Sequence, residues 1–295
     1  MSHIKKKIRN SYGDKIFDGI NIMLLVMVSL TMVIPFIYII VGSFATSQDL
    51  MERSFFLIPK SFTMLNYEYI FSSPSIPNSL VVSLLRTVLG TIINLVFTAT
   101  LAFSISHKCI VGRRVINSLL VFTIIFNGGM IPTYLVVRGT GLLDSIWSLL
   151  IPGAINTFNL MLWKTFFSEI PEEMEEAAQI DGCNDLTIFI KIILPLSFSS
   201  IATFTVFYAV AHWNAYFDAM MYINDSAKWP IQIYLRQVVI LSQGGVGDLS
   251  SVDLMPPDKG IKFATIIISA APIMIIYPFM QKYFMDGVMM GAVKG

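Results

Sequence analysis

Charged residues, cysteine and histidine are all scarce in this sequence. Lys, Arg, Asp and Glu supply 13% of the 295 residues, whereas 55% are hydrophobic and the mean hydropathy is +0.70. Soluble globular domains carry about 25% charged residues, so the composition excludes an ordinary soluble domain and indicates a multi-pass membrane protein. The formal net charge of +1 also argues against nucleic acid as a partner.

The sequence also lacks the motifs of metal binding, nucleotide binding and hydrolytic catalysis. Two cysteines, Cys109 and Cys183, and three histidines do not have the spacing of a metal site. The glycine-rich stretch at residues 244–248 lacks the lysine of a phosphate-binding loop, and no Ser/His/Asp arrangement is suggested at a common depth. We therefore expect no enzyme activity, no metal, ATP or other cofactor bound by this chain, and no disulfide framework.

Six apolar segments are long enough to cross a bilayer as helices, which takes about 20 residues each. Five basic residues in the N-terminal tail mark a cytoplasmic start under the positive-inside rule. No small-residue cleavage site follows the first segment, so we expect a retained helix. The predicted fold class is an all-α membrane protein with six transmembrane helices between residues 19 and 281 and both termini in the cytoplasm. The segments are residues 19–41, 79–106, 115–137, 146–167, 188–211 and 261–281, flanked by tails at residues 1–18 and 282–295.

Polar and aromatic residues within or beside these segments predict a transport path. Residues 127–129 and Pro132 break the third segment, and irregular backbone at membrane depth is tolerated only where it is buried in protein or lines a cavity. Amide groups bind hydroxyls and aromatic rings stack on sugar faces, so the pattern suits a neutral polyhydroxylated ligand. The candidate path residues are Asn127, Tyr134, Asn156, Asn159, Trp213, Asn214 and Tyr216.

Other polar side chains in the segments are expected to serve helix packing. A stripe on the second segment recurs every three or four residues and should hydrogen-bond neighbouring helices. We expect Arg86 to snorkel or to pair near the outer end of its helix, and His212 to be a satisfied interface histidine. The apolar run at residues 231–241 should form a helix at the outer interface or against the bundle. The stripe consists of Thr87, Thr91, Asn94 and Thr98.

The acidic cluster at residues 168–187 predicts two short helices joined by a glycine bend. Pro171 opens the first helix, and the acidic residues of its first turn suit the helix dipole. Gly182 stands where a C-terminal turn needs positive φ. Asn184 and Asp185 can cap the second helix. The segment therefore reads as helix, glycine bend and helix.

The spacing in this segment resembles the signature loop of the membrane-spanning subunits of bacterial ATP-binding-cassette (ABC) importers. Glu176-Ala-Ala is followed after three residues by Gly182, and after nine more by Ile192-x-Leu194-Pro195.

The resemblance extends over nearly the whole chain. The six segments, the Trp213-Asn214 pair and the ending at residues 291–295 are similar to the shorter subunit of the maltose-type pair in the sugar-uptake branch. Residues 126–144 further resemble permeases for oligosaccharides released from complex polysaccharides such as pectin or alginate.

The resemblance implies a type I ABC importer permease fold in the bacterial plasma membrane, with a cytoplasmic coupling helix that lies in a cleft of an ATPase subunit. The implied partners are a second homologous permease subunit, two ATPase subunits that carry ATP and magnesium, and an extracytoplasmic sugar-binding protein. Small alanines would let the partner approach closely, a carboxylate would meet a partner Arg or Lys, and the C-terminal tail would reach into the ATPase dimer. The implied ATPase-coupling residues are Glu175, Glu176, Ala177, Ala178, Asp181, Gly182, Lys294 and Gly295.

Two hypotheses of other classes stay open beside a sugar importer permease. An ion-coupled carrier or channel for a small polar solute would need carboxylates within the spans, whereas Asp144 and Asp218 lie at helix ends. An integral membrane enzyme would need a catalytic constellation at one interface. Neither pattern is found in the sequence.

Overall fold

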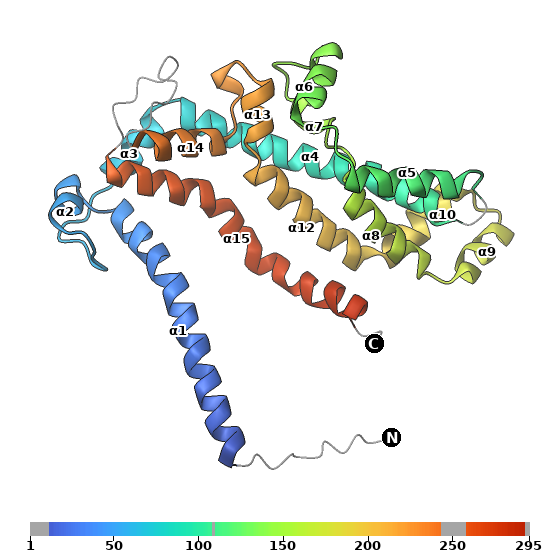
Figure 1. Ribbon diagram of the computed structural model, residues 1–295, viewed down its shortest axis with the longest axis horizontal. Helices are drawn as coiled ribbons and strands as arrows, with labels where there is room; N and C mark the ends of the chain where they lie inside the picture. The colour runs from blue at the N-terminus through green and yellow to red at the C-terminus, as the bar shows by residue number, and fades with distance from the viewer. Residues whose placement is uncertain (1–11, 108–109, 243–257, 293–295) are drawn as a thin grey trace.

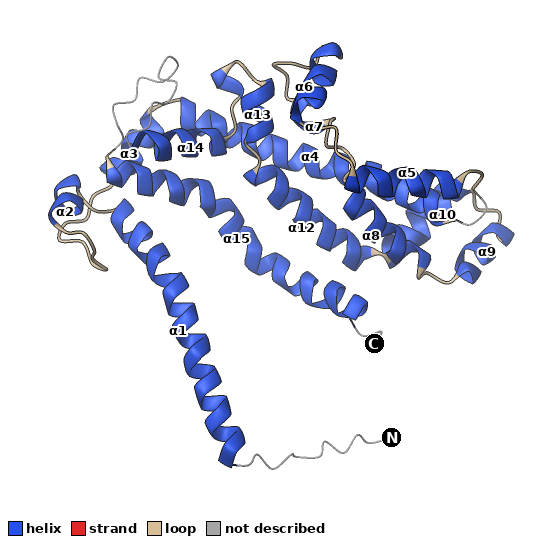
Figure 2. Ribbon diagram, in the orientation of Figure 1, coloured by secondary structure: helices blue, strands red, loops and turns tan. Residues whose placement is uncertain are grey.

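The computed structural model is built of helices (Figure 1), and Figure 2 draws no strand among the residues described. The structure describes residues 12–107, 110–242 and 258–292, with side chains given as far as residue 240 and again for residues 258–278. Lys294 and Gly295, both predicted to contact the ATPase, lie outside this range.

Three helices are long and apolar enough to cross a membrane. They are α1 (Tyr12–Ser43), α4 (Ser75–Ser106) and the first part of α15 (Lys259–Ala292), up to Pro278. Two bent helix pairs raise the number of spans to five if each pair counts as one span, so six spans are not confirmed by the described residues.

The predicted fourth span, residues 146–167, is not one helix. It is divided into α7 (Trp147–Leu150) and α8 (Thr157–Ser168), with non-helical residues between them. The 12 residues of α8 extend for about 18 Å, which is short of the roughly 30 Å of a hydrocarbon core.

The third predicted span breaks where the sequence indicates. Helix α5 (Arg113–Ile125) and helix α6 (Met130–Gly139) meet at 117°. In the connection, the side-chain oxygen of Asn127 accepts a hydrogen bond from the Gly129 N–H at 2.8 Å, and Gly129 has a φ of +84°. The break at residues 127–129 is therefore confirmed.

The fifth predicted span is bent, which the sequence interpretation did not foresee. Residues Asp185–Leu196 meet α12 (Phe198–Asn214) at 83°. A π-helical turn, η1, precedes the bend, and Pro195 lacks the N–H that a continuous helix would use. The elements before α12 are α10 (Asp185–Ile188), η1 (Phe189–Ile193) and α11 (Leu194–Leu196).

Helix α4 is the centre of the packing, with α8 and α12 against it (Figure 1). Thr98 Oγ1 lies 3.0 Å from the Tyr208 hydroxyl. Asn94 donates to the carbonyls of Gly153 and Ala154, and its Oδ1 lies 2.5 Å from His212 Nε2. These contacts confirm packing roles for half of the predicted polar stripe and for the histidine.

The other half of the stripe has no hydrogen-bond partner among the described residues. The hydroxyls of Thr87 and Thr91 are buried beside an apolar groove of about 390 Å³ between α4, α12 and α15.

Short helices cap the end of the bundle at which α4 and α15 begin. Arg86, only 2% exposed, pairs with Asp218 and donates to the Ala215 carbonyl at 3.0 Å, so it pairs rather than snorkels. The run at residues 231–241 is helical, and Ile231 and Tyr234 are buried against α15, which confirms a helix against the bundle. The outer elements are α2 (Ser47–Glu52), α3 (Leu65–Ser72), α13 (Phe217–Tyr222), η2 (Ser226–Lys228) and α14 (Ile231–Ser242).

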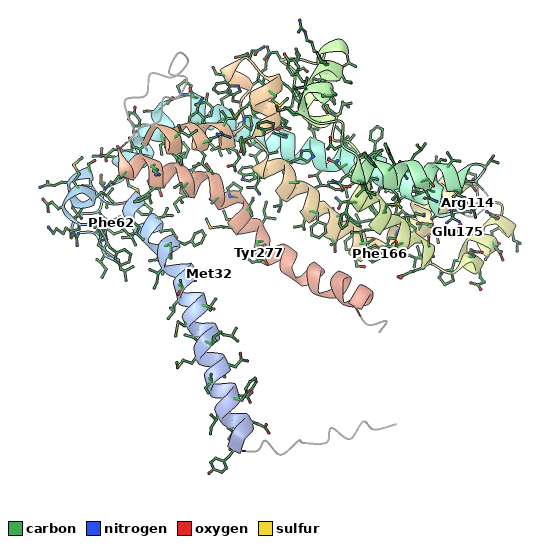
Figure 3. All side chains as sticks on the ribbon, viewed as in Figure 1. Met32, Phe62, Arg114, Phe166, Glu175 and Tyr277 are labelled. Atoms are coloured by element: carbon green, nitrogen blue, oxygen red, sulfur yellow. The ribbon has the colours of Figure 1, made fainter. Side chains whose placement is uncertain are left out.

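Helix α1 stands away from the bundle for most of its length (Figure 1). None of its apolar spanning window is buried within this chain, and side chains such as Met32, labelled in Figure 3, project freely. Because such a surface is stable only in lipid or against another apolar surface, the arrangement fits a membrane environment.

Candidate coupling site and transport path

The predicted coupling segment begins with α9 (Glu172–Ile180), whose C-terminal end fixes the direction of the chain. Gly182 has a φ of +84°, and its N–H donates to the Gln179 carbonyl at 3.0 Å. The Cys183 N–H donates to the Ala178 carbonyl at 2.9 Å. These two bonds form a Schellman motif, which satisfies carbonyls that a helix end leaves free. The positive φ predicted for Gly182 is confirmed.

The second helix of the segment is capped as predicted. The side-chain oxygen of Asn184 accepts a hydrogen bond from the Thr187 N–H at 2.8 Å. This bond satisfies one of the backbone donors that the first turn of α10 leaves without an intrahelical partner. The unit of helix, glycine bend and helix is therefore present.

The two alanines of the signature face different surroundings. Ala178 is only 6% exposed and lies in the main core cluster with Phe167 and Ile188. Its small side chain therefore lets α9 pack closely on other helices of the same chain. The sequence interpretation had instead placed Ala178 at the surface that meets a partner. The predicted coupling residues that remain exposed are Glu176, Ala177, Asp181 and Gly182.

Glu175 is turned towards the membrane helices (Figure 3). Its Oε2 lies 2.7 Å from Nε2 of His107, the residue that follows α4, and the two side chains are 19% and 26% exposed. The carboxylate is thus engaged within the chain, which the sequence interpretation missed because the two residues lie far apart in sequence.

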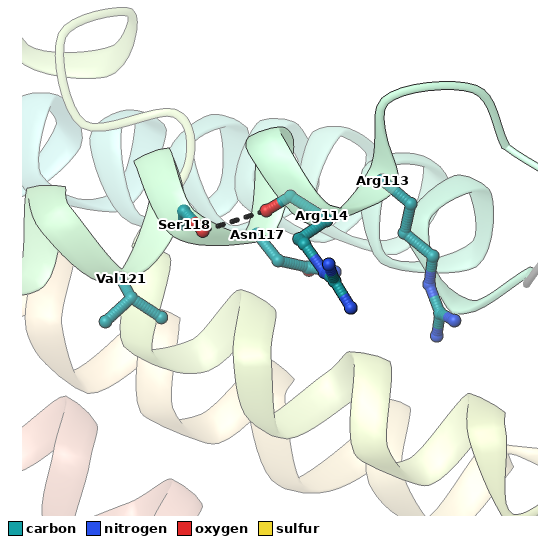
Figure 4. A pocket seen from close by; sticks show the side chains of 5 residues that line it. All are labelled: Arg113, Arg114, Asn117, Ser118 and Val121. Carbon is teal, nitrogen blue, oxygen red and sulfur yellow. Dashed lines mark hydrogen bonds between the residues drawn. The ribbon is translucent and has the colours of Figure 1, made fainter.

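A basic surface flanks this unit at the first turns of α5 (Figure 4). Arg113 donates through Nε to the Ile105 carbonyl and through Nη2 to the Ser106 carbonyl, each at 3.1 Å. Lys164 on α8 donates to Asn117 Oδ1 at 2.8 Å. Positive charge at this end of the helices is what the positive-inside rule predicts for a cytoplasmic face. The groove shown in Figure 4 is lined by Arg113, Arg114, Asn117, Ser118 and Val121.

Three of the predicted path residues gather where α5 ends and α8 begins. Thr123 and Thr157 hydroxyls lie 3.1 Å apart and fix this proximity. Asn156 caps α8 by accepting a hydrogen bond from the Asn159 N–H at 3.0 Å, while Asn127 is exposed in the break after α5. The bonds of Asn127 and Asn156 use their side-chain oxygens and leave the amide donors for other partners. The Asn159 side chain, in contrast, hydrogen-bonds to the Tyr208 hydroxyl.

The remaining path candidates lie in other clusters. Tyr134 stacks on Tyr222, with ring centroids 6.2 Å apart. Trp213 is 3% exposed and its indole donates to the Ser269 carbonyl at 2.9 Å, so in this conformation the ring belongs to the helix packing. Asn214 is exposed and donates to a carbonyl of its own helix. The contacts among described residues therefore do not join all seven candidates in one site.

Tyr216 lies beside a cation that the sequence interpretation did not select. The guanidinium carbon of Arg236 lies 4.9 Å from the centroid of the Tyr216 ring. Arg236 is exposed and forms no ion pair with any residue that the structure describes. The only signal for it in the sequence is that it interrupts an apolar run.

Comparison with known proteins identifies the family. No protein-family model matches the chain. Protein LplC of Bacillus subtilis is 49% identical over 290 residues, and the match covers 98% of both chains. The polygalacturonan/rhamnogalacturonan transport system permease protein YtcP of the same bacterium is 48% identical over 284 residues, covering 96% of this chain and 99% of its own. A crystal structure of a bacterial ABC transporter involved in the import of the acidic polysaccharide alginate contains a chain with 34% identity and a TM-score of 0.86, covering 93% of this chain and 99% of that one.

The chain belongs to the permease subunits of bacterial ABC sugar importers. This assignment confirms the resemblance drawn from the signature loop and decides against the ion-coupled carrier and the membrane enzyme. The permease is a membrane protein of a carbohydrate uptake system, and its all-helical fold matches that of the alginate importer chain. In an ABC permease, the exposed unit of α9, Gly182 and α10 is the natural candidate for the contact with an ATPase.

Proposed function

We propose that this permease spans the membrane six times with both termini in the cytoplasm and forms half of a heterodimeric translocation path. In this arrangement α7, α8 and the residues between them make up the fourth span. A second permease subunit forms the other half, and an extracytoplasmic binding protein delivers the sugar. Two ATPase subunits, which hold ATP and magnesium, bind the cytoplasmic face. The basic residues before α1 support this orientation.

The observation that carries the coupling role is the geometry of the acidic unit. Helix α9 is exposed on most of its surface, yet Ala178 seats it on the core and the Schellman motif ties it to α10. From α10 the chain runs through η1 and α11 into the 83° bend and then into α12, which packs on α4. A partner that closes on α9 therefore moves α12 directly, and that movement alternately opens the path to either side of the membrane.

The substrate that we propose is an acidic oligosaccharide of the kind released from pectin or alginate. The transport of polygalacturonan and rhamnogalacturonan by the YtcP system, and of alginate by the importer of known structure, support this class. Within this chain, the exposed guanidinium of Arg236, held over the Tyr216 ring, offers a cation for a uronate carboxylate. A path for neutral sugars would have no need of that cation.

The test is reconstitution of the permease pair with its ATPase subunits and binding protein in proteoliposomes. We expect oligogalacturonides or alginate oligosaccharides to stimulate ATP hydrolysis and to accumulate, and neutral maltooligosaccharides of matched length to do neither. Arg236→Gln should raise the KM for acidic oligosaccharide about tenfold, whereas Arg138→Gln, an exposed arginine on α6 as a matched control, should not. Equal uptake of neutral and acidic sugars would reject the proposed substrate class.

A further inference from the structure

Both nitrogens of the His107 ring face hydrogen-bond acceptors. Nδ1 lies 2.8 Å from the carbonyl oxygen of Phe103, in the last turn of α4. Nε2 lies 2.7 Å from Glu175 Oε2 on α9. The ring also stands edge-on to the Phe103 ring, with centroids 4.6 Å apart and planes at 87°. His107 thus bridges the end of a membrane helix and the coupling helix.

While the Glu175 carboxyl is ionised, this geometry can be fully hydrogen-bonded only by a protonated ring. A neutral imidazole has one N–H and one lone pair, whereas an imidazolium has two N–H donors. A carbonyl oxygen and a carboxylate oxygen both only accept. In either neutral tautomer, one ring nitrogen would present its lone pair to an acceptor, and one of the two contacts would be lost.

The charged groups around the ring strengthen this dependence on protonation. A pocket of about 300 Å³ between the α4–α5 connection and α9 is lined by four described charged residues, Arg113, Glu172, Glu175 and Glu176. All three carboxylates belong to α9, so a positive ring attracts this helix and a neutral ring does not. Arg113 is committed to the carbonyls of the residues just before His107, which fixes the backbone from which the ring projects.

We propose that His107 is a positioning residue that latches the coupling helix α9 to the end of α4 through Glu175 while its ring is protonated. Because only the protonated ring completes both contacts, the latch makes coupling sensitive to the pH of the cytoplasm. With the latch closed, α9 is presented to the ATPase in one orientation. With the latch open, α9 loses this contact and keeps those made by Ala178 and by the Schellman motif. The inference rests on the proposed coupling role of α9.

The test uses the complete transporter in proteoliposomes and measures sugar transported per ATP hydrolysed between about pH 6 and about pH 8. We expect the wild-type ratio to fall about threefold over this range, as loss of a partly exposed charge pair predicts. Glu175→Gln should give a low ratio without this pH dependence, and His107→Lys, which keeps its charge, should also lose the dependence. Glu173→Gln is the matched control, because Glu173 lies on the same helix and is exposed. It should keep the wild-type profile.

Hydrogen exchange of the α9 amides in the same complexes provides a readout that does not depend on transport. At about pH 6, the wild type and Glu173→Gln should protect α9 several-fold more than Glu175→Gln does. Equal pH profiles and equal protection in wild type and Glu175→Gln would overturn the latch. A wild-type transporter without sugar-stimulated hydrolysis at any pH would instead reject the coupling role of α9, and the exchange experiment would still decide whether the contact exists.

Discussion

Replacing Gly182 with valine should weaken coupling while leaving the permease in the membrane. Gly182 has a φ of +84°, and no neighbouring atom lies within 4 Å of a Cβ built at this position. The cost is therefore backbone strain rather than overlap, and it amounts to about 1–2 kcal/mol for a residue other than glycine. Asparagine adopts this region more readily. A strain of about 1.4 kcal/mol lowers the population of the native bend about tenfold.

The pair Gly182→Val and Gly182→Asn separates backbone conformation from side-chain size, because the two side chains have similar volumes. The measurement is sugar transported per ATP hydrolysed in proteoliposomes, at equal amounts of inserted permease. We expect a loss of up to about tenfold for valine and about twofold for asparagine. A valine variant that couples normally would refute the importance of the bend angle. Equal losses for both variants would refute strain as the cause and indicate that the partner's surface excludes any side chain there.

Two further changes test the helix packing and the turn at Asp144. Gly90→Ala would place a Cβ 2.5 Å from the His212 ring. It should lower the free energy of unfolding in detergent by about 1–3 kcal/mol, and the Tm should fall with it. Gly19→Ala on α1, where no atom lies within 4 Å, should not lower it, and equal Tm values would contradict the tight α4–α12 contact. A hydrogen bond from Lys228 holds the pKa of the Asp144 carboxyl below its usual range, so the stability it contributes is present at neutral pH and lost as pH falls through that lowered value. The measurement is hydrogen exchange of the two amides that donate to Asp144, corrected for the intrinsic exchange rate at each pH. In the wild type, the protection of these amides should fall at acid pH. In Asp144→Asn it should not depend on pH in this way.

The features that the sequence predicted correctly are those that local chemistry decides. Gly182 needs a backbone that only glycine adopts without strain, and Asn127 and Asn184 bond to backbone groups two or three residues away. Such interactions do not depend on the rest of the fold. For the same reason, the glycine bend could be located to the residue, and the break after α5 and the cap of α10 to within a few residues.

The features that the sequence did not reveal depend on contacts between distant segments. Alanine and tryptophan occur both at partner surfaces and in protein cores. Ala178 and Trp213 are buried because α9 and α12 pack against other helices of this chain. The contact between His107 and Glu175 joins residues 68 positions apart. Small polar residues at helical spacing usually serve helix packing, and the contacts of Asn94 and Thr98 confirm this for half of the stripe on α4. The sequence could not name their partners, nor show that Thr87 and Thr91 have none among the described residues.

Backbone hydrogen bonds hold both bends between α9 and α12, and this matters for the proposed coupling role. At the first bend, the N–H groups of Gly182 and Cys183 are both bonded to carbonyls of α9. At the second, the N–H of Ser197 is shared between the carbonyls of Ile193 and Leu194, at 3.0 and 3.2 Å, and its own carbonyl accepts from Ile201. A joint whose backbone groups are satisfied resists bending, because bending would break bonds that the surroundings cannot replace. In the proposed coupling mechanism, a displacement of α9 would therefore reach α12 without being absorbed at either joint, in a direction set by the 83° bend and the glycine bend.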